Sequence, residues 1–234
     1  MFGGSQRVLV AAPHPDDECL GMGGTIRRHI ESGDEVTVAV LTGPGEGPYA
    51  GTHPLAGPEE FEAVRREFHA AMRVLGVERT EFLPLPSVAV PDLPVHAVNA
   101  LVADLVGRVR PDTLYLPYAW DMHRDHRDLA YAFSVAWRPS GAAGAAIRDV
   151  LMYEVVSETH WTPPFVHPPF EPNVFVDVEA QLDAKHEALA CYRSQMRASP
   201  HARSHETLRA LATFRGSQSG LTAAEAFLAV RQIR

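Results

Sequence analysis

The chain of 234 residues has almost no lysine: Lys185 is the only one, and arginine supplies the other basic side chains. Acidic residues outnumber basic ones by 29 to 21, so the formal net charge is -8 with histidine neutral. Affinity for nucleic acid comes largely from clustered lysine and arginine, and this acidic chain has no basic block. We therefore expect no nucleic-acid partner.

Long apolar runs and cysteine are also scarce. No run approaches the ~18–20 residues that span a bilayer, and the first residues lead into a strand-like segment without the layout of a secretory signal. Cys19 and Cys191 are too few and too far apart in the sequence for a disulfide framework, so we expect both thiols to stay reduced. These features predict a cytoplasmic protein without a membrane span.

The first half of the chain alternates strand-like and helix-like segments. Apolar, β-branched runs predict strands at residues 7–12, 35–41, 81–85 and 112–116, and helical spacing predicts helices at 21–32, 59–75 and 95–110. Such alternation is typical of right-handed βαβ units. We expect residues 1–234 to form a single α/β domain, Rossmann-like, with a mostly parallel sheet flanked by helices.

The later half is less regular, and we expect an irregular C-terminal third. Strands are predicted at 150–156 and 173–178, a flexible connection at 140–146, and helices at 183–197 and 222–233. Two long connections, 43–58 and 159–172, are rich in proline. Unstructured loops longer than ~12–15 residues are often functional in compact domains, so we expect both to contact substrate. Arg65 and Arg66 are interpreted as a solvated helix face, with sugar or anion binding as the alternative.

The first expected strand runs into a cluster of titratable side chains. His14 is followed by the consecutive carboxylates Asp16 and Asp17. Burying such groups costs free energy unless a cation or hydrogen bonds compensate. His14 and Asp17 are three residues apart in a turn, so both can face one centre, and an imidazole with a carboxylate suits zinc. Taken alone, the pattern is equally compatible with a helix N-cap at Asp16 or Asp17.

The fourth expected strand leads to a second cluster, which contains His123, Asp125 and His126. In parallel sheets the ligand site lies beyond the carboxyl ends of the strands. If strands 7–12 and 112–116 are neighbours, one of these histidines completes a site with three protein ligands, the pattern of catalytic zinc. A solvated surface turn explains this cluster alone, but two clusters at two strand ends favour a metal site.

These motifs resemble those of the LmbE-like, or PIG-L, family of zinc-dependent de-N-acetylases, which act on N-acetylglucosaminyl-phosphatidylinositol and on sugar precursors of mycothiol and bacillithiol. The family's AHPDDE motif corresponds to residues 13–18, with Pro13 in place of alanine. Its HPDH motif corresponds to residues 123–126, with Arg124 in place of proline. Residues 185–195 resemble the family's K-x-E-A-L…SQ helix, and residues 215–227 resemble its RG…G…EAF ending.

The resemblance implies a role for each residue of the two clusters. His14, Asp17 and His126 would bind zinc, or another divalent ion such as Fe²⁺. Asp16 would be the general base that takes a proton from metal-bound water. His123 would act at the oxyanion and the leaving nitrogen, with Asp125 orienting or tuning His123.

The function that follows is removal of an acetyl or similar acyl group from the amide nitrogen of an amino sugar or glycosylated small molecule. The rival is a metal-dependent lyase or hydratase that acts on an unsaturated organic acid with the same site. A small-molecule substrate is expected in both cases. The sequence does not define the exact substrate or the residue that protonates the leaving amine. It does not define the subunit number either, and a homo-oligomer is compatible with it.

Overall fold

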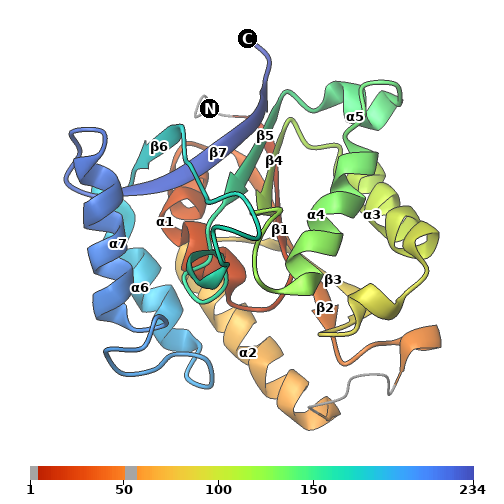
Figure 1. Cartoon of the computed structure of the whole chain (residues 1–234), viewed down its shortest axis with the longest axis horizontal. Coiled ribbons are helices and arrows are strands. Elements are labelled where there is room, and N and C mark those ends of the chain that lie inside the picture. The colour runs from red at the N-terminus through yellow and green to blue at the C-terminus, as the bar shows by residue number, and fades with distance from the viewer. Residues whose placement is uncertain (1–4, 51–56) are drawn as a thin grey trace.

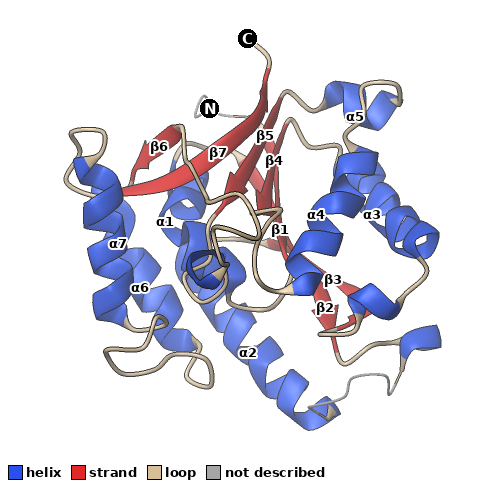
Figure 2. Ribbon diagram, viewed as in Figure 1, coloured by secondary structure: helices blue, strands red, loops and turns tan. Residues whose placement is uncertain are grey.

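The computed structural model describes residues 5–50 and 57–234. Within them, one seven-stranded sheet is covered by helices on both faces (Figures 1 and 2). The strands are β1 Arg7–Ala12, β2 Glu35–Gly43, β3 Arg79–Pro86, β4 Thr113–Pro117, β5 Asp149–Tyr153, β6 Val174–Asp177 and β7 Ala224–Gln232. The α-helices are α1 Asp17–Glu31, α2 Pro58–Leu75, α3 Val95–Val109, α4 Arg124–Ala136, α5 Ala142–Ala146, α6 Leu182–Cys191 and α7 His205–Ser217. No helix in this described part is both long and apolar enough to cross a membrane.

The sheet has the order β3-β2-β1-β4-β5-β7-β6. Strands β3, β2, β1, β4 and β5 pair in parallel with one another, whereas β7 pairs antiparallel with both β5 and β6. The predicted α/β fold with a mostly parallel sheet is therefore confirmed. Because β1 and β4 are direct neighbours, their carboxyl ends lie side by side at one edge.

Alternate residues of β1 point into two separate hydrophobic cores. Val8 and Val10 pack with side chains of α1, α2 and α6, whereas Leu9 and Ala11 pack with side chains of α3 and α4. This is the expected pattern for a strand buried on both faces of a parallel sheet. The same division is visible in Figure 1, where α3, α4 and α5 lie on one side of the sheet and α1, α6 and α7 on the other.

The prediction of a helix at residues 222–233 is wrong. The segment forms strand β7, which is hydrogen-bonded between β5 and β6. Its alanine, glutamate and leucine residues favour a helix by intrinsic propensity. Two open strand edges that pair with it on both sides override that preference, because strand formation depends on the neighbours available.

Other predicted elements differ in their ends or their type. The helix expected to reach residue 197 stops at Cys191, and a loop follows up to Ser204. The expected flexible connection at 140–146 contains the short helix α5, and the C-terminal third contains α6, α7, β6 and β7. Helix α1 begins at Asp17, four residues before the predicted start, so the first polar cluster lies at its N-terminus.

Helix α1 is broken in the middle, at Met22, whose backbone leaves the helical region. Glu225 of β7 accepts hydrogen bonds from the backbone N–H of Thr25 and of the residue before it, and so caps the second half of the helix. Lys185 of α6 pairs with Glu225 at 2.6 Å and donates to the carbonyl of Leu20 at 3.0 Å. Lys185, the only lysine of the chain, thus links the two halves of α1, the helix that follows the first polar cluster.

Candidate active site

The two polar clusters meet at the carboxyl ends of β1 and β4. The turn after β1 carries His14, Asp16 and Asp17, and the segment after β4 carries the residues from Asp121 to His126. The pairing of β1 with β4 brings these segments together, as the sequence predicted. The carboxylates and His126 are buried, His14 and His123 keep partial exposure, and Arg124 is exposed.

Three side-chain atoms form a nearly equilateral triangle. The Nδ1 atom of His14 lies 3.3 Å from Oδ2 of Asp17. The Nε2 atom of His126 lies 3.2 Å from the same carboxylate oxygen and 3.2 Å from Nδ1 of His14. Tetrahedral zinc with bonds of roughly 2.0–2.2 Å places neighbouring donor atoms about 3.3 Å apart. The triangle therefore has the dimensions of three ligands of one ion.

The other nitrogen of each imidazole faces a buried carboxylate. Nε2 of His14 donates to Oδ2 of Asp125 at 3.0 Å, and Nδ1 of His126 donates to Oδ2 of Asp121 at 2.8 Å. These bonds fix the ring tautomers, so the lone pairs of Nδ1 of His14 and Nε2 of His126 point toward each other. Two lone pairs and a carboxylate oxygen directed at one point are a donor set suited to a cation. Such carboxylate–histidine pairs are usual around protein-bound metals.

A buried oxygen without a partner also indicates a cation site. Oδ1 of Asp17 is buried and has no hydrogen-bond partner among the described residues. An unsatisfied buried carboxylate oxygen is costly, and a bound ion is one explanation for it. Taking one ligand atom per residue, His14, His123 and His126 also lie within 4.8 Å of one another, which marks the same region as able to hold a metal.

Asp16 occupies an unusual position between the two ligand candidates of the first turn. Its backbone has a φ of 123°, a value that favours glycine and costs other residues about 1–3 kcal/mol. Its carboxylate is buried, and Oδ2 accepts a 2.8 Å ion-pair hydrogen bond from Arg203. Arg203 is held in turn by Ser157 and Gln195. Backbone strain at a buried charged residue is typical of a functional site.

The charges in this cluster perturb one another strongly. Burial alone would raise the pKa of Asp17, but the charge of His126 and hydrogen bonds from both histidines hold it well below its usual range. Burial opposes a charge on His14, yet hydrogen bonds to its two carboxylate partners raise its pKa to about 9. Burial raises the pKa of Asp16 to about 8, while the charge of Arg203 acts in the opposite direction. The centre therefore attracts positive charge, and metal binding would release protons.

His123 is the N-cap residue of α4. Its Nδ1 accepts a 3.2 Å hydrogen bond from the backbone N–H of Asp125, so the proton of the neutral ring is on Nε2. The Asp125 carboxylate lies 4.0 Å from this ring and is closer to His14. Backbone N–H groups of Val88 and Val90 also donate to that carboxylate.

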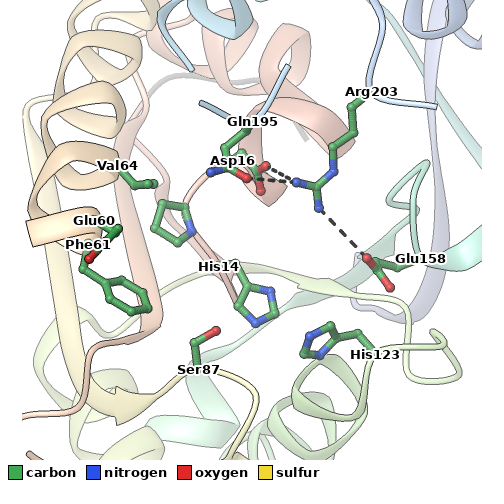
Figure 3. A pocket seen from close by; sticks show the side chains of 11 residues that line it. His14, Asp16, Glu60, Phe61, Val64, Ser87, His123, Glu158, Gln195 and Arg203 are labelled. Carbon is green, nitrogen blue, oxygen red and sulfur yellow. Dashed lines mark hydrogen bonds and ion pairs between the residues drawn. The ribbon is translucent and has the colours of Figure 1, made fainter. Parts of the chain in front are cut away.

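A cavity of about 390 Å³ opens over these groups. Figure 3 shows Arg203 between Asp16 and Glu158, facing His14 and His123 across the cavity. Its lining residues are His14, Pro15, Asp16, Glu60, Phe61, Val64, Ser87, His123, Glu158, Gln195 and Arg203. No role was expected for Arg203, Glu158 or Ser87. Of these, only Arg203 follows a recognisable motif, eight residues after Gln195 of the S-Q pair.

The loop at residues 159–172 packs against the protein and does not line this cavity within the described residues. Tyr118 donates to the carbonyls of Pro168 and Pro169, and the ring of His167 stacks on Trp120. The other expected substrate loop, 43–58, lines a neighbouring cavity with its first residues, and residues 51–56 lie outside the described part.

Comparison with known proteins identifies the family. The family model described as PIG-L, GlcNAc-PI de-N-acetylase, matches residues 9–137, which include both polar clusters. The chain belongs to the PIG-L family. Diacetylchitobiose deacetylase of Thermococcus kodakarensis is 27% identical over 231 residues, covering 96% of this chain and 83% of that protein.

Solved structures share the fold of this chain. The N,N'-diacetylchitobiose deacetylase of Pyrococcus horikoshii superposes with a TM-score of 0.76 at 23% identity, over 97% of this chain and 84% of its own. The 4-carboxy-2-hydroxymuconate hydratase of Pseudomonas putida superposes with a TM-score of 0.74 at 22% identity, over 100% and 98% of the two chains. At these identities the two structures show the shared fold and nothing about the reaction.

Proposed function

We propose that this PIG-L family enzyme is a metal-dependent hydrolase that removes an acetyl or similar acyl group from the amide nitrogen of an amino sugar or glycosylated small molecule. The observation that carries the proposal is the triangle of His14, Asp17 and His126 donor atoms beside the buried carboxylate of Asp16. A metal centre next to a carboxylate that can act as a general base is a suitable arrangement for hydrolysis of an amide by water.

We propose His14, Asp17 and His126 as the metal ligands. Their spacing, the fixed tautomers of both imidazoles and the unpartnered Oδ1 of Asp17 all fit a divalent ion. His123 is the other candidate, but its Nδ1 is engaged in capping α4. Two imidazoles and one carboxylate suit zinc, with Fe²⁺ as the alternative. When bound, the ion would supply Lewis acidity, lowering the pKa of coordinated water to about 7 and polarising the amide carbonyl.

Asp16 is proposed as the general base. Arg203 binds its Oδ2 and fixes the side chain at the wall of the cavity, which leaves the other carboxylate oxygen to accept the proton of the attacking water. The same carboxyl group then holds that proton within the site. We propose that it delivers the proton to the leaving amine, since a general acid must be protonated when the carbon–nitrogen bond breaks.

His123 is proposed to stabilise the developing oxyanion. Because its Nδ1 accepts the Asp125 backbone N–H, its Nε2–H is the group able to donate to the substrate carbonyl oxygen. One such preorganised donor contributes about 2.7–4 kcal/mol to transition-state stabilisation. A neutral imidazole serves this purpose, because its Nε2–H donates a hydrogen bond to the oxyanion and keeps the proton, while Asp16 transfers the proton from water.

Deacetylation is favoured over hydration of a carbon–carbon double bond. The matching family model is that of a de-N-acetylase, and the relative aligned over nearly the whole chain is named as a deacetylase. The hydratase shares the fold at 22% identity, too low to carry an argument about its reaction. The proposed substrate is accordingly an N-acetylated amino sugar or glycoside. We place the enzyme in the cytoplasm, where the free thiols of Cys19 and Cys191 stay reduced.

The test is acetate release from N-acetylglucosamine derivatives by the zinc-loaded protein, with metal content measured for each variant. Asp17→Ala and His126→Ala should lose zinc and activity together, whereas Asp16→Asn should retain zinc and lose turnover. Asp128→Asn changes a carboxylate that pairs with Arg124 on α4 and serves as the control. Normal turnover by Asp16→Asn would exclude the proposed base. Consumption of an unsaturated acid without acetate release would favour the hydratase.

A further inference from the structure

Glu158 is an acidic side chain of the active-site cavity to which the proposed reaction gives no role. It lies in the segment after β5, and its side chain is 16% exposed. Its backbone N–H donates to the carbonyl of Val155, and its own carbonyl accepts hydrogen bonds from the N–H of Met122 and the hydroxyl of Thr162. These bonds fix the point at which the carboxylate enters the cavity.

The charge of this carboxylate is only weakly compensated. Oε1 of Glu158 lies 4.0 Å from Nη2 of Arg203, whereas Nη1 of the same guanidinium lies 2.8 Å from Oδ2 of Asp16. The described residues provide no hydrogen bond to the Glu158 carboxylate, and burial raises its pKa above the usual range. A cation that donates hydrogen bonds to such a carboxylate compensates both its charge and its lost hydration.

One guanidinium separates the carboxylates of Asp16 and Glu158, so a small ligand in the cavity can reach both of them. Figure 3 shows the two carboxylates on opposite sides of Arg203. The proposed hydrolysis leaves an amine beside Asp16, which delivers the proton to the leaving nitrogen. Amino groups in water have pKa values of about 8–10, so the freed amine takes up a proton near neutral pH. The product is then a cation within reach of Glu158.

We propose that Glu158 binds the ammonium group of the amino-sugar product and so makes the cavity selective for a protonated amine over a neutral ligand. The inference rests on the proposed function, which supplies the amine. The ammonium donates hydrogen bonds to the Glu158 carboxylate, and an uncharged substituent at the same position gains less, because hydrogen bonds between charged groups are the stronger ones. The enzyme is therefore inhibited by its own product.

The test measures the dissociation constants of glucosamine and glucose by calorimetry, at pH 6.5 and on the zinc-loaded protein. The two sugars differ at one position, an ammonium in place of a hydroxyl group, and neither has an acyl group to be removed. We expect glucosamine to bind at least about tenfold more tightly, a difference of about 1.4 kcal/mol. Glu158→Gln keeps the size of the side chain and removes its charge, and should reduce this ratio to about threefold or less with the affinity for glucose unchanged.

Glu62→Gln is the matched control. Glu62 lies on α2, its side chain is 57% exposed, and it does not line the active-site cavity. Its replacement should leave the ratio unchanged, because water and salt screen an exposed charge. Equal affinity for the two sugars or no binding of glucosamine would overturn the proposal. A ratio unaffected by Glu158→Gln would also overturn it and would assign the preference to the zinc ion, which can coordinate a free amine.

The binding ratio is independent of turnover, and acetate release from N-acetylglucosamine is measured separately. In that assay glucosamine should inhibit competitively, and Glu158→Gln should raise its inhibition constant by the factor found in calorimetry while the KM for the neutral substrate stays the same. Acetate release with equal sugar affinities removes only the role of Glu158. A ratio that depends on Glu158, without acetate release, leaves Glu158 as a cation-binding residue and removes the hydrolase proposal.

Discussion

Oδ2 of Asp125 lies 3.0 Å from Nε2 of His14 but 4.0 Å from Nδ1 of His123. The carboxylate therefore holds the ring of His14, with two backbone N–H groups of the loop after β3 holding the carboxylate itself. Asp121 has the same relationship to His126, at 2.8 Å. Each histidine proposed as a metal ligand is thus oriented by its own buried carboxylate. Asp125, which was expected to orient His123, makes its shorter contact with His14.

Asp125→Asn and Asp121→Asn are expected to lower zinc affinity by about 10–100-fold, because loss of such a partner releases the ring orientation and lowers its basicity. Competition with a fluorescent chelator measures the affinity directly. Asp128→Asn, which removes a half-buried carboxylate of α4 that pairs with Arg124, should leave the affinity unchanged. Unaltered zinc affinity in both buried variants would contradict the proposed ligand set.

Lys185→Met should weaken zinc binding from a distance. Its ammonium joins the two halves of α1 through Leu20 and Glu225, and the first half carries Asp17. Removing one partner of a buried pair costs about 3–5 kcal/mol of stability. The folded variant should also bind zinc about tenfold less tightly, since metal-site geometry is lost. Ile26→Ala, in the second half of α1, should cost about 2–5 kcal/mol with zinc affinity unchanged. Equal zinc affinity in both variants would make Lys185 purely structural.

Arg203→Met should reduce turnover while metal content is preserved. Arg203 touches the proposed base, and none of its contacts involves a proposed metal ligand. Without it the Asp16 carboxylate loses its fixed direction, and a displacement of about 1 Å at a reacting group costs roughly 100-fold in rate. Steady-state kinetics should show the loss mainly in kcat, with zinc content by metal analysis equal to that of the unsubstituted chain. A loss of zinc in this variant would place Arg203 among the groups that support the ion.

Stability should fall in mild acid because of His186, whose Nδ1 lies 2.9 Å from Nδ1 of His205 between α6 and α7. Burial, together with the charge of Arg209, lowers the pKa of His186 to about 4. The unfolded chain protonates this ring near its ordinary value of about 6.5. Between those values the unfolded state binds the extra proton, so this contribution to stability is complete above pH 6.5 and is lost as the pH falls toward 4.

Urea unfolding at pH 7 and pH 5 tests this contribution. The unsubstituted chain should lose up to about 2 kcal/mol more than His186→Gln between the two pH values. An identical loss in both proteins would assign the acid sensitivity to other groups.

The first half of the fold and the polar cluster of each strand end could be predicted from the sequence because their signals are local. Strand β1 matches its predicted range, and its alternate side chains are buried on both faces. The two clusters follow β1 and β4, which pair directly in parallel. The general rule that ligand sites lie at the carboxyl ends of parallel strands was therefore enough to predict that the clusters meet.

The elements that depend on distant partners were not predictable in this way. Strand β7 has a helical composition and exists because β5 and β6 flank it. Arg203 reaches Asp16 across 187 positions, from a loop whose path no local pattern defines. The contact of Asp125 with His14 was not expected either, because only the fold shows that Asp125 turns its carboxylate toward the first turn.

Glycines in helix α1 allow close packing against neighbouring elements but lower the intrinsic stability of the helix. A methyl group on Gly21 would lie 2.3 Å from the ring of Tyr153, and one on Gly24 would lie 2.8 Å from Val178. Each glycine weakens an isolated helix by about 1 kcal/mol relative to alanine. The turn that presents Asp17 should therefore take shape only after the later strands have docked against it. A nascent chain that has not yet produced those strands would carry both polar clusters and still be unable to retain an ion.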